Sequence, residues 1–282
     1  MRRVVSFLSA PGGVGKTSLC LTLSWMLREK GSSPFLFDLD PSLGLTLRFL
    51  NIHEYFNEVE TVQRTSADLI RRVHSQEVGR WDEANQYVRQ VNFKGIPLYL
   101  VPSSIRLEDV LGEIWHGSSL GRGKTLQSTL SVFPEDSTIF VDVIPCYELK
   151  YALLTLIASD CIVVPLRPTP NDMGRTILMM RQLAKKASPE VEEETFQSKL
   201  CFAFNMVRHQ DEKRVQVYKQ TLVEKFPGAR VFREDVPTRV SFNRIGTGEE
   251  RGDDEKNVKE VLRKFLGEFE EVFGSIGCDA PS

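Results

Sequence analysis

The first apolar run of the chain ends in the stretch SAPGGVGKTS, residues Ser9 to Ser18. Glycine has no Cβ, so the three glycines of this stretch let the backbone turn several N–H groups toward one point. Lys16 adds a charge for phosphate groups, Thr17 adds a hydroxyl for Mg²⁺, and a helix that starts here directs its positive end at an anion. The stretch therefore predicts a nucleotide phosphate loop made of Gly12, Gly13, Val14, Gly15, Lys16, Thr17 and Ser18.

The context of this loop favours the same interpretation. A strict GxxxxGK[ST] pattern would have glycine at position 10, where the chain has Ala10. However, the loop follows an expected strand at residues 3–8 and opens an expected helix at residues 16–30, which is the context that the motif requires. We therefore expect the loop to bind phosphate despite the alanine.

Short β-rich runs alternate with amphipathic helical patterns along most of the chain. Strands that are apolar on both faces and alternate with helices are typical of a mostly parallel sheet covered on both sides. We expect an α/β fold of the P-loop NTPase type, with a doubly wound, mostly parallel sheet in a single domain over residues 1–282. The expected strands are residues 3–8, 34–39, 96–101, 137–142, 160–166, 199–205 and 230–232, and the clearest helices are 16–30, 172–187 and 211–226.

Two segments depart from this alternation. Residues 51–94 are polar and mostly helical in pattern, and we expect them to form an insertion over one edge of the sheet, a candidate partner surface. Residues 255–274 form a helical pattern with an apolar stripe and a mixed, partly acidic opposite face. A helix lying on a membrane would have Lys and Arg dominating its polar face, so we expect this helix to dock on the core. The stripe consists of Val258, Val261, Leu262, Phe265, Phe269, Val272 and Phe273.

Three aspartates stand where expected strands end. Asp38 and Asp40 occupy alternate positions and point the same way if the strand continues that far. Asp142 follows four β-type residues, which is the pattern of a Walker B strand. Phosphates and metal lie at the carboxyl ends of the strands in such a sheet, so we expect the three carboxylates to converge near one Mg²⁺. Each one alone carries little weight, because aspartate is also a common turn former.

Several ordered motifs together resemble the ParA/MinD family of deviant Walker ATPases. The GGVGKT loop is followed by a strand ending in DLDP at 38–41 and by the segment PSSIRLEDV at 102–110. A Walker B strand follows, with a proline three residues beyond its aspartate. The later matches are ASD at 158–160, VP at 164–165, FNMV at 204–207 and VFREDVPTRVSFN at 231–243. The resemblance covers essentially the whole chain apart from the insertion and the tail.

This resemblance implies a protein that binds and hydrolyses ATP with Mg²⁺ and forms a homodimer around the nucleotide. Transferred position by position, it assigns Lys16 to the phosphates and Asp40 to the attacking water. Thr17 ligates the metal, and Asp38 and Asp142 act through the waters of the metal. Lys16, Asp40 and Asp142 are thus the expected catalytic residues, for a reaction that needs charge neutralisation and a positioned water.

The resemblance also implies a site for the base. Asn205 would hydrogen-bond the adenine edge, and the chain around Pro237 and Thr238 would pack on the base.

One position departs from the family pattern. The signature lysine of the family, which reaches the partner's phosphates across the dimer, is replaced by Pro11. Proline has neither a charge nor a backbone N–H, and it stiffens the entry to the loop. Either another cation substitutes, with Arg3, Arg167 and Arg175 as candidates, or the coupling of hydrolysis to dimerisation is weakened. Our hypothesis is an atypical member that binds ATP well and hydrolyses it slowly.

The leading functional interpretation is an ATP-dependent switch of the chromosome- or plasmid-partitioning kind, which binds DNA without sequence specificity. Phosphate contacts by Lys and Arg would provide such affinity, although these residues often form only a solvated helix face. An unidentified partner protein is also expected. The candidate DNA contacts are Arg208, Lys213, Arg214, Lys219, Arg239 and Arg244.

Other functional classes remain open. A protein-binding module that uses ATP only as a conformational ligand agrees with Pro11 and with the insertion at 51–94. A P-loop ATP-dependent ligase would share the fold but would not explain the DLDP motif. A membrane positioner would need a basic amphipathic tail, and an iron–sulfur carrier would need paired cysteines, neither of which the sequence supplies.

The composition leads us to expect a cytoplasmic protein. The formal net charge of -2 creates no global positive field. The five cysteines include no CxxC pair, which argues against a metal cluster and a secreted disulfide framework. No apolar run is long enough to span a membrane. Cys20, Cys161 and Cys201 are expected to be buried, whereas Cys146 is a weak candidate for redox chemistry.

Overall fold

The computed structural model describes residues 2–117, 122–145, 149–238, 242 and 251–273. Its centre is a nine-stranded sheet. The strands are β1 (Arg3–Phe7), β2 (Phe35–Leu39), β3 (Arg89–Phe93), β4 (Ile96–Val101), β5 (Thr138–Val143), β6 (Cys161–Leu166), β7 (Leu200–Val207), β8 (Arg230–Val231) and β9 (Val236–Pro237). Their order is β3-β4-β2-β5-β1-β6-β7-β8, with β9 paired to the end of β7. β3 is antiparallel to β4, and the other pairings among the described strands are parallel.

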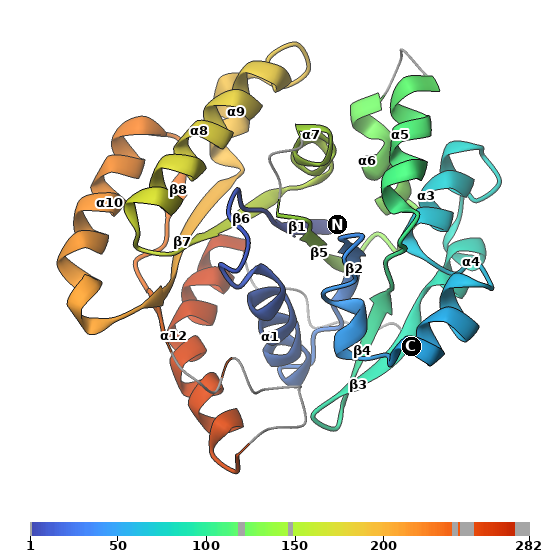
Figure 1. The fold of residues 1–282 in the computed structure, drawn as a ribbon, viewed down its shortest axis with the longest axis horizontal. Helices are drawn as coiled ribbons and strands as arrows, with labels where there is room; N and C mark the ends of the chain where they lie inside the picture. The colour runs from blue at the N-terminus through green and yellow to red at the C-terminus, as the bar shows by residue number, and fades with distance from the viewer. Residues whose placement is uncertain (1, 118–121, 146–148, 239–241, 243–250, 274–282) are drawn as a thin grey trace.

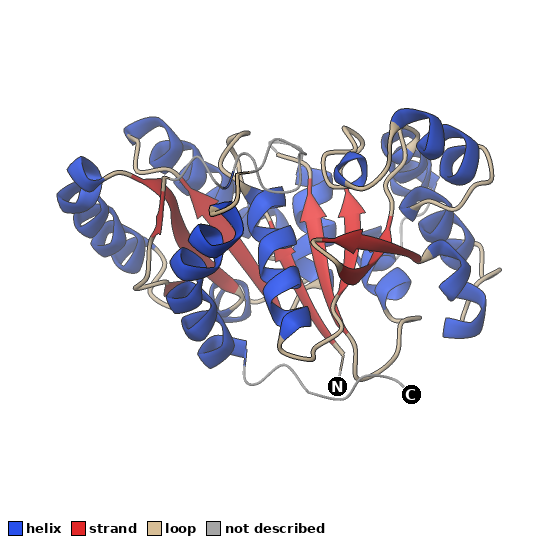
Figure 2. Ribbon diagram, turned by 90° about the horizontal axis from the view of Figure 1, so that it is seen from below, coloured by secondary structure: helices blue, strands red, loops and turns tan. Residues whose placement is uncertain are grey.

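Helices cover both faces of this sheet (Figures 1 and 2). Helices α1 (Lys16–Glu29) and α12 (Asp254–Phe273) lie on one face. The opposite face is covered by α3 (Ser66–His74), α5 (Leu107–Gly117), α6 (Thr125–Leu130), α7 (Leu149–Ala158), α8 (Pro170–Ala187), α9 (Glu193–Ser198) and α10 (Glu212–Lys225). The shorter elements are η1 (Thr46–Arg48), α2 (Ile52–Tyr55), η2 (Phe56–Glu60), α4 (Trp81–Ala84), η3 (Asn85–Tyr87), η4 (Arg122–Lys124) and η5 (His209–Asp211). The predicted doubly wound, mostly parallel α/β fold is therefore confirmed.

The strands direct alternate side chains into two separate cores. On β2, Phe35 and Phe37 pack into the core under the larger helical layer, whereas Leu36 packs into the core under α1 and α12. On β5, Phe140 belongs to the core on the α1 side. Because side chains alternate along a strand, Asp38 and Asp142 share the face of Leu36 and Phe140. Both aspartates therefore point to the side of the sheet where the phosphate loop opens α1.

The insertion at 51–94 contains the expected helices and one strand that the sequence pattern did not predict. This strand, β3, forms the edge of the sheet and returns to β4 through a two-residue turn at Lys94 and Gly95. Both turn residues have positive φ, 56° and 78°, as in a type I′ hairpin. The sequence signal was weak because lysine occupies the position where Asn or Asp usually marks this turn.

Buried polar groups anchor the insertion to the chain that follows β4. Nε of Arg106 donates to Oε1 of Glu60 at 2.6 Å, and its Nη2 lies 3.2 Å from Oδ1 of Asp68. Oγ of Ser104 donates to Glu60 at 3.0 Å, and the hydroxyl of Tyr55 donates to the same carboxylate. The insertion is thus fixed to the β4 end by hydrogen bonds and ion pairs as well as by packing.

Helix α12 turns its apolar stripe toward the core. Leu262, Phe265 and Phe269 are fully buried or nearly so. The ring of Phe265 lies 4.7 Å from that of Phe232, and the ring of Phe269 lies 5.8 Å from that of Phe140. The described part of the stripe therefore packs against the sheet, with Val261 and Val272 partly buried at its margin.

Candidate nucleotide-binding site

The loop between β1 and α1 depends on glycines with left-handed backbone conformations. Gly13 has a φ of 69° and Gly15 a φ of 87°, and residues with a Cβ rarely adopt such values. A Cβ on Gly15 would also lie 2.3 Å from Nδ2 of Asn205. Gly15 immediately precedes Lys16, the first residue of α1, so the free N–H groups of the first helical turn open into the loop. This is the geometry of an anion site at a helix N-terminus.

Lys16 lies across this loop. Its side chain is buried, and its Nζ donates to Oγ of Ser9 at 3.1 Å. The hydroxyl of Ser9 donates in turn to the carbonyl oxygen of Pro11 at 2.8 Å. The ammonium group is therefore held beside the loop backbone, where it could form a short charge-assisted hydrogen bond to a bound phosphate.

Two buried carboxylates stand next to each other at the carboxyl ends of β2 and β5. Asp38 and Asp142 are direct partners in the parallel register, and both are almost inaccessible to solvent. Burial raises the pKa of Asp142 to about 7, and the Thr17 hydroxyl and the Lys16 ammonium oppose this shift. Burial, reinforced by the charge of Asp142, raises the pKa of Asp38 well above its ordinary value. Two like charges this close together and away from water are relieved by a bound proton or by a cation.

The two carboxylates differ in their hydrogen bonds. Oδ2 of Asp38 accepts from both N and Oγ1 of Thr46, at 2.8 and 2.7 Å, and its Oδ1 accepts from N of Asp40 at 3.1 Å. Neither oxygen of Asp142 makes a hydrogen bond of good geometry to a described residue, although the Thr17 hydroxyl is close enough to favour the charged form of the carboxylate. Asp38 is thus held in place by the protein, whereas Asp142 keeps its lone pairs for another ligand.

These residues fit Mg²⁺. The ion is often bound by one or two carboxylates together with water and phosphate oxygens, and the oxygens of Asp142 meet that description. Within the described ranges, there is no cluster of three or more His, Cys, Asp and Glu that could hold a metal. A cation here would therefore depend on phosphate, with Thr17, Asp38 and Asp142 as the protein groups nearest to it.

Asp40 lies just beyond the strand that was expected to contain it. β2 ends at Leu39, and Oδ1 of Asp40 accepts from the backbone N of Ser42 at 2.8 Å. The turn that follows packs over the start of α1, because a Cβ on Gly44 would lie 3.8 Å from Oγ1 of Thr17. A turn, rather than strand alternation, thus positions Asp40 near the phosphate loop.

The residues expected to hold the base line one small cavity of about 70 Å³. Asn205 has a second contact that the sequence did not reveal, since its Nδ2 donates to the carbonyl oxygen of Val14 at 2.7 Å. An amide nitrogen has two donors, so Asn205 can support the loop and still donate to a ligand. The cavity is lined by Gly15, Ser18, Leu19, Asn205, Met206, Pro237, Thr238 and Phe242.

The candidate substitutes for the signature lysine are less suitable than the sequence suggested. Arg3 is the first residue of β1, so it lies at the amino end of this strand, whereas the loop follows the carboxyl end. Arg167 is held by Asp172, with Nε to Oδ2 at 2.6 Å and Nη2 to Oδ1 at 3.1 Å. Arg175 lies on α8 and has an interaction of its own. Pro11 itself is buried, so its side chain does not extend toward a second subunit.

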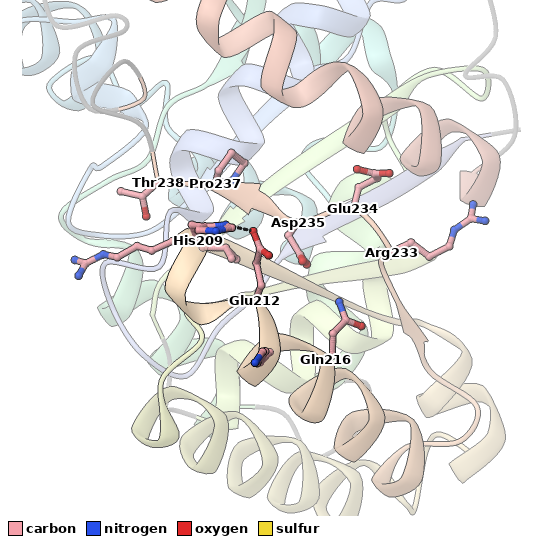
Figure 3. Close-up of a pocket in the computed structure, with 11 residues that line it drawn as sticks. His209, Glu212, Gln216, Arg233, Glu234, Asp235, Pro237 and Thr238 are labelled. Carbon is pink, nitrogen blue, oxygen red and sulfur yellow. Dashed lines mark hydrogen bonds and ion pairs between the residues drawn. The ribbon is translucent and has the colours of Figure 1, made fainter.

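An open groove of about 980 Å³ lies beside the base cavity and shares Pro237 and Thr238 with it (Figure 3). Arg208 and Lys213 line this groove, together with acidic residues such as Glu212, which pairs with His209 at 2.7 Å. The groove is therefore mixed in charge, and its cations alternate with carboxylates.

Two of the expected DNA contacts are engaged within the fold. Nη1 of Arg214 lies 3.1 Å from Oδ1 of Asp211. Lys219 is only 14% exposed and lies 2.8 Å from Oδ1 of Asp235. Lys219 is therefore removed from the candidate DNA contacts. Arg239 and Arg244 lie outside the described residues, as does Cys146.

The sheet and the loop before α1 place the protein in the class of P-loop NTPases. A family model described as "AAA domain" matches residues 2–190. The chain belongs to this family, and its fold is that of the ParA/MinD-like P-loop ATPases, as the sequence motifs implied.

One curated protein and several solved structures are similar to this chain. The uncharacterized protein MJECL24 of Methanocaldococcus jannaschii is 27% identical over 224 residues, which are 77% of this chain and 79% of that protein. The structure of apo McdA from Cyanothece has a TM-score of 0.73 at 17% identity, covering 97% of this chain and 100% of that one.

Two further solved structures illustrate the range of the fold. A plasmid partition protein from Borrelia burgdorferi has a TM-score of 0.62 at 15% identity, covering 95% of this chain and 99% of that one. Cobyrinic acid a,c-diamide synthase from Mycobacterium smegmatis, with a bound ATP analogue and magnesium, has a TM-score of 0.67 at 17% identity, covering 98% and 96% of the two chains. At these identities, the likeness establishes the fold.

Several residues of the site were not singled out by the sequence analysis. Ser9 holds Lys16, Thr46 holds Asp38, and Ser103 contacts Thr46. Ser9 and Thr46 are isolated hydroxyl residues with no spacing signal of their own. Ser103 belongs to the PSSIR segment, which had been noted only as part of the resemblance.

Two further expectations concern cysteines and membranes. Cys20, Cys161 and Cys201 are free and buried, as predicted. In the part of the chain that the structure describes, no helix is both long and apolar enough to cross a membrane.

Proposed function

We propose that the protein is a ParA-like ATPase that binds Mg·ATP, hydrolyses it slowly and uses the nucleotide as a switch for homodimerisation. One observation carries this proposal. The loop with Lys16 lies beside the buried carboxylates of Asp38 and Asp142, which are neighbours at the carboxyl ends of β2 and β5. Family membership supports it, as does the ATP analogue with magnesium in a protein of the same fold.

Each residue has a defined part in the proposed reaction. The loop N–H groups from Gly12 to Lys16 and the ammonium of Lys16 bind the phosphates. When bound, Mg²⁺ neutralises phosphate charge and orients the phosphoryl group. Asp142, Asp38 and the hydroxyl of Thr17 would hold the ion and its waters. Asp40 orients the attacking water.

The base has its own proposed contacts. Asn205 donates to the adenine edge, and Pro237 and Thr238 pack on the ring at the cavity that they line. Asn205, Pro237 and Thr238 are far in sequence from the loop at residues 12–18, so folding is needed to bring these residues together with the loop.

The switch is tested by measuring molar mass by light scattering, with and without Mg·ATP, for the wild type and for Asp40→Ala. We expect the mass to double from 32.1 kDa when Mg·ATP is added, and to remain doubled for longer in Asp40→Ala because hydrolysis no longer separates the subunits. Lys16→Ala is the matched control and should stay monomeric. A wild type that binds Mg·ATP and remains monomeric would contradict the switch.

The slow turnover is tested separately by single-turnover hydrolysis. Pro11 offers no charge to a second subunit, and Arg167 is already paired, so we expect hydrolysis to be slow. Pro11→Lys restores the signature charge and is expected to accelerate hydrolysis by about tenfold or more, since charges at phosphoryl oxygens act mainly on the transition state. Equal rates in the two proteins would show that the proline is not the reason for slow turnover.

We further propose that the ATP-bound form acts in the cytoplasm in DNA partitioning and binds DNA through Arg208 and Lys213. The double variant Arg208→Gln/Lys213→Gln is expected to weaken DNA binding and to lower the magnitude of the salt slope by about 1–2, since each lost phosphate contact removes roughly 0.9. Lys185→Gln/Lys186→Gln, on exposed positions of α8, is the charge-matched control. Equal salt slopes in the two double variants would exclude these contacts.

The second candidate is an ATP-gated binding module without DNA, favoured by the buried Pro11 and by the insertion that is anchored next to the site. The two candidates differ in one measurement, because a module of this kind would bind Mg·ATP with no salt-dependent affinity for DNA. The P-loop ligase alternative would instead form ADP only when a second, acceptor substrate is present.

A further inference from the structure

We propose that Thr46 is the positioning residue that orients Asp38 toward Mg²⁺, and that the chain after β4 fixes the direction of its hydroxyl. The inference rests on the proposed function, because it concerns the same Mg·ATP site. It adds a residue that neither the phosphate loop nor the strand-end aspartates include.

Thr46 makes the strongest set of contacts to Asp38. It is fully buried, and both its N and its Oγ1 donate to Oδ2 of Asp38, at 2.8 and 2.7 Å. Donors to a carboxylate form the stronger class of hydrogen bonds. Two such bonds on one oxygen fix the plane of the carboxylate, so Asp38 has little freedom to turn away from its neighbour Asp142.

The hydroxyl of Thr46 has only one orientation that satisfies its surroundings. A hydroxyl has one proton to donate and two lone pairs. Oγ1 of Thr46 accepts from the backbone N of Ser103 at 2.9 Å, so a lone pair is used there and the proton is directed to Asp38. The backbone N–H of Ser103 thus sets the orientation of the Thr46 hydroxyl, so that this hydroxyl donates its proton to Asp38.

The support behind Ser103 is rigid. The next residue, Ser104, donates to Glu60, and Glu60 is paired with Arg106. Arg106 also pairs with Asp68 at the start of α3. These groups are buried or partly buried, and buried polar networks whose members are satisfied restrict motion. Asp38 is therefore held to the fold by a chain of contacts that ends in the insertion.

Asp38 and Asp142 differ in how firmly the protein holds them, and this difference bears on the binding of a cation. Asp142 makes no hydrogen bond of good geometry to a described residue, and its named neighbours are the Thr17 hydroxyl and the Lys16 ammonium of the loop before α1. The hydrogen bonds from Thr46 therefore leave Asp38 as the carboxylate that fixes the geometry of the site, and the oxygens of Asp142 keep their lone pairs for a ligand. Residues that orient such groups typically affect metal affinity by about 10- to 100-fold.

The test compares Thr46→Val, which keeps the shape but lacks the hydroxyl, with Thr46→Ser, which keeps the hydroxyl. Thr129→Val is the matched control, because Thr129 is also fully buried but its Oγ1 donates only to Thr125 O within α6. The measurement is the affinity for fluorescent ATP as Mg²⁺ is titrated, repeated in EDTA, with the folded state of each variant checked by circular dichroism.

We expect Thr46→Val to require about 10- to 100-fold more Mg²⁺ for tight nucleotide binding, in line with the usual effect of residues that orient metal ligands. Its affinity in EDTA should equal that of the wild type, and Thr46→Ser and Thr129→Val should resemble the wild type in both titrations. If Thr46→Val does not fold, Thr46→Cys, which donates only weakly, should show the same increase in Mg²⁺ requirement.

Three results would overturn the inference. The first is an unchanged Mg²⁺ requirement in the hydroxyl-free variant. The second is an equal loss of affinity in EDTA, which would show that Thr46 supports the loop rather than Asp38. The third is a wild type that binds ATP without regard to Mg²⁺, which contradicts the role of Thr46 but leaves nucleotide binding intact. A wild type that binds no nucleotide at all would instead overturn the proposed function as well.

Discussion

Replacing Asp142 with asparagine is expected to make the nucleotide-free protein more stable and, at the same time, to abolish the effect of Mg²⁺ on ATP binding. The carboxylate is buried and its oxygens make no hydrogen bond of good geometry to a described residue. Burial raises its pKa to about 7, so its charge destabilises the fold at pH 8. Asparagine keeps the shape and removes this charge.

The sign of the pH dependence follows from the raised pKa. Unfolded aspartate has a pKa near 3.9, so between that value and about 7 the folded protein binds a proton that the unfolded chain does not. The contribution of Asp142 to the free energy of unfolding therefore falls as pH rises through this range. We expect Asp142→Asn to raise the melting temperature by about 3–6 °C at pH 8 and by progressively less toward pH 4.

The measurement is thermal unfolding at several pH values, with and without ATP, in Mg²⁺ or in EDTA. ATP should stabilise the wild type more strongly with Mg²⁺ than in EDTA, whereas it should stabilise Asp142→Asn equally under the two conditions. Asp172→Asn is the matched control, because Asp172 is equally buried but paired with Arg167, and its loss should lower stability at pH 8. A lower melting temperature for nucleotide-free Asp142→Asn would contradict our account of this carboxylate.

Replacing Gly15 with alanine is expected to eliminate tight nucleotide binding and to destabilise the protein. At φ 87°, a residue with a Cβ costs about 1–2 kcal/mol, and the new Cβ would lie 2.3 Å from Nδ2 of Asn205. Asn205 must then move, which breaks its bond to the carbonyl oxygen of Val14. The loop and the base cavity are thus disturbed by one methyl group.

We expect ATP affinity to fall by about 100-fold or more, which corresponds to roughly 3 kcal/mol. Calorimetric titration with Mg·ATP measures this loss, and chemical denaturation measures the stability. Gly174→Ala is the control, because Gly174 lies inside α8 with open space around it, and alanine there should stabilise the helix by about 1 kcal/mol. Wild-type affinity in Gly15→Ala would mean that the nucleotide does not bind at this loop.

Local patterns in the sequence were sufficient to predict the class of the fold. Runs such as residues 35–39 are apolar on both faces, and they alternate with helices such as 16–29, so a parallel sheet between two helical layers is the arrangement that buries both. The glycine-rich loop before α1, for which we propose phosphate binding, could also be located from the sequence, because its glycines and Lys16 are close together in the chain. The strand β3 could not be predicted in this way. A Lys-Gly turn is a weak hairpin signal, and residues 89–93 form a strand because they pair with β4.

The tertiary structure decided how these pieces act together. The chain itself could supply Asp38 and Asp142 as strand-end residues, but only the parallel register of β2 and β5 makes them neighbours. Likewise, Thr46 and Ser103 are 57 positions apart, and Asn205 is 191 positions from Val14. A hydrogen bond between distant residues leaves no periodicity or spacing in the sequence. The sequence by itself therefore determined the fold class and located the glycine-rich loop for which we propose phosphate binding, whereas only the folded chain determined which carboxylate is held by hydrogen bonds and which residue supports the loop.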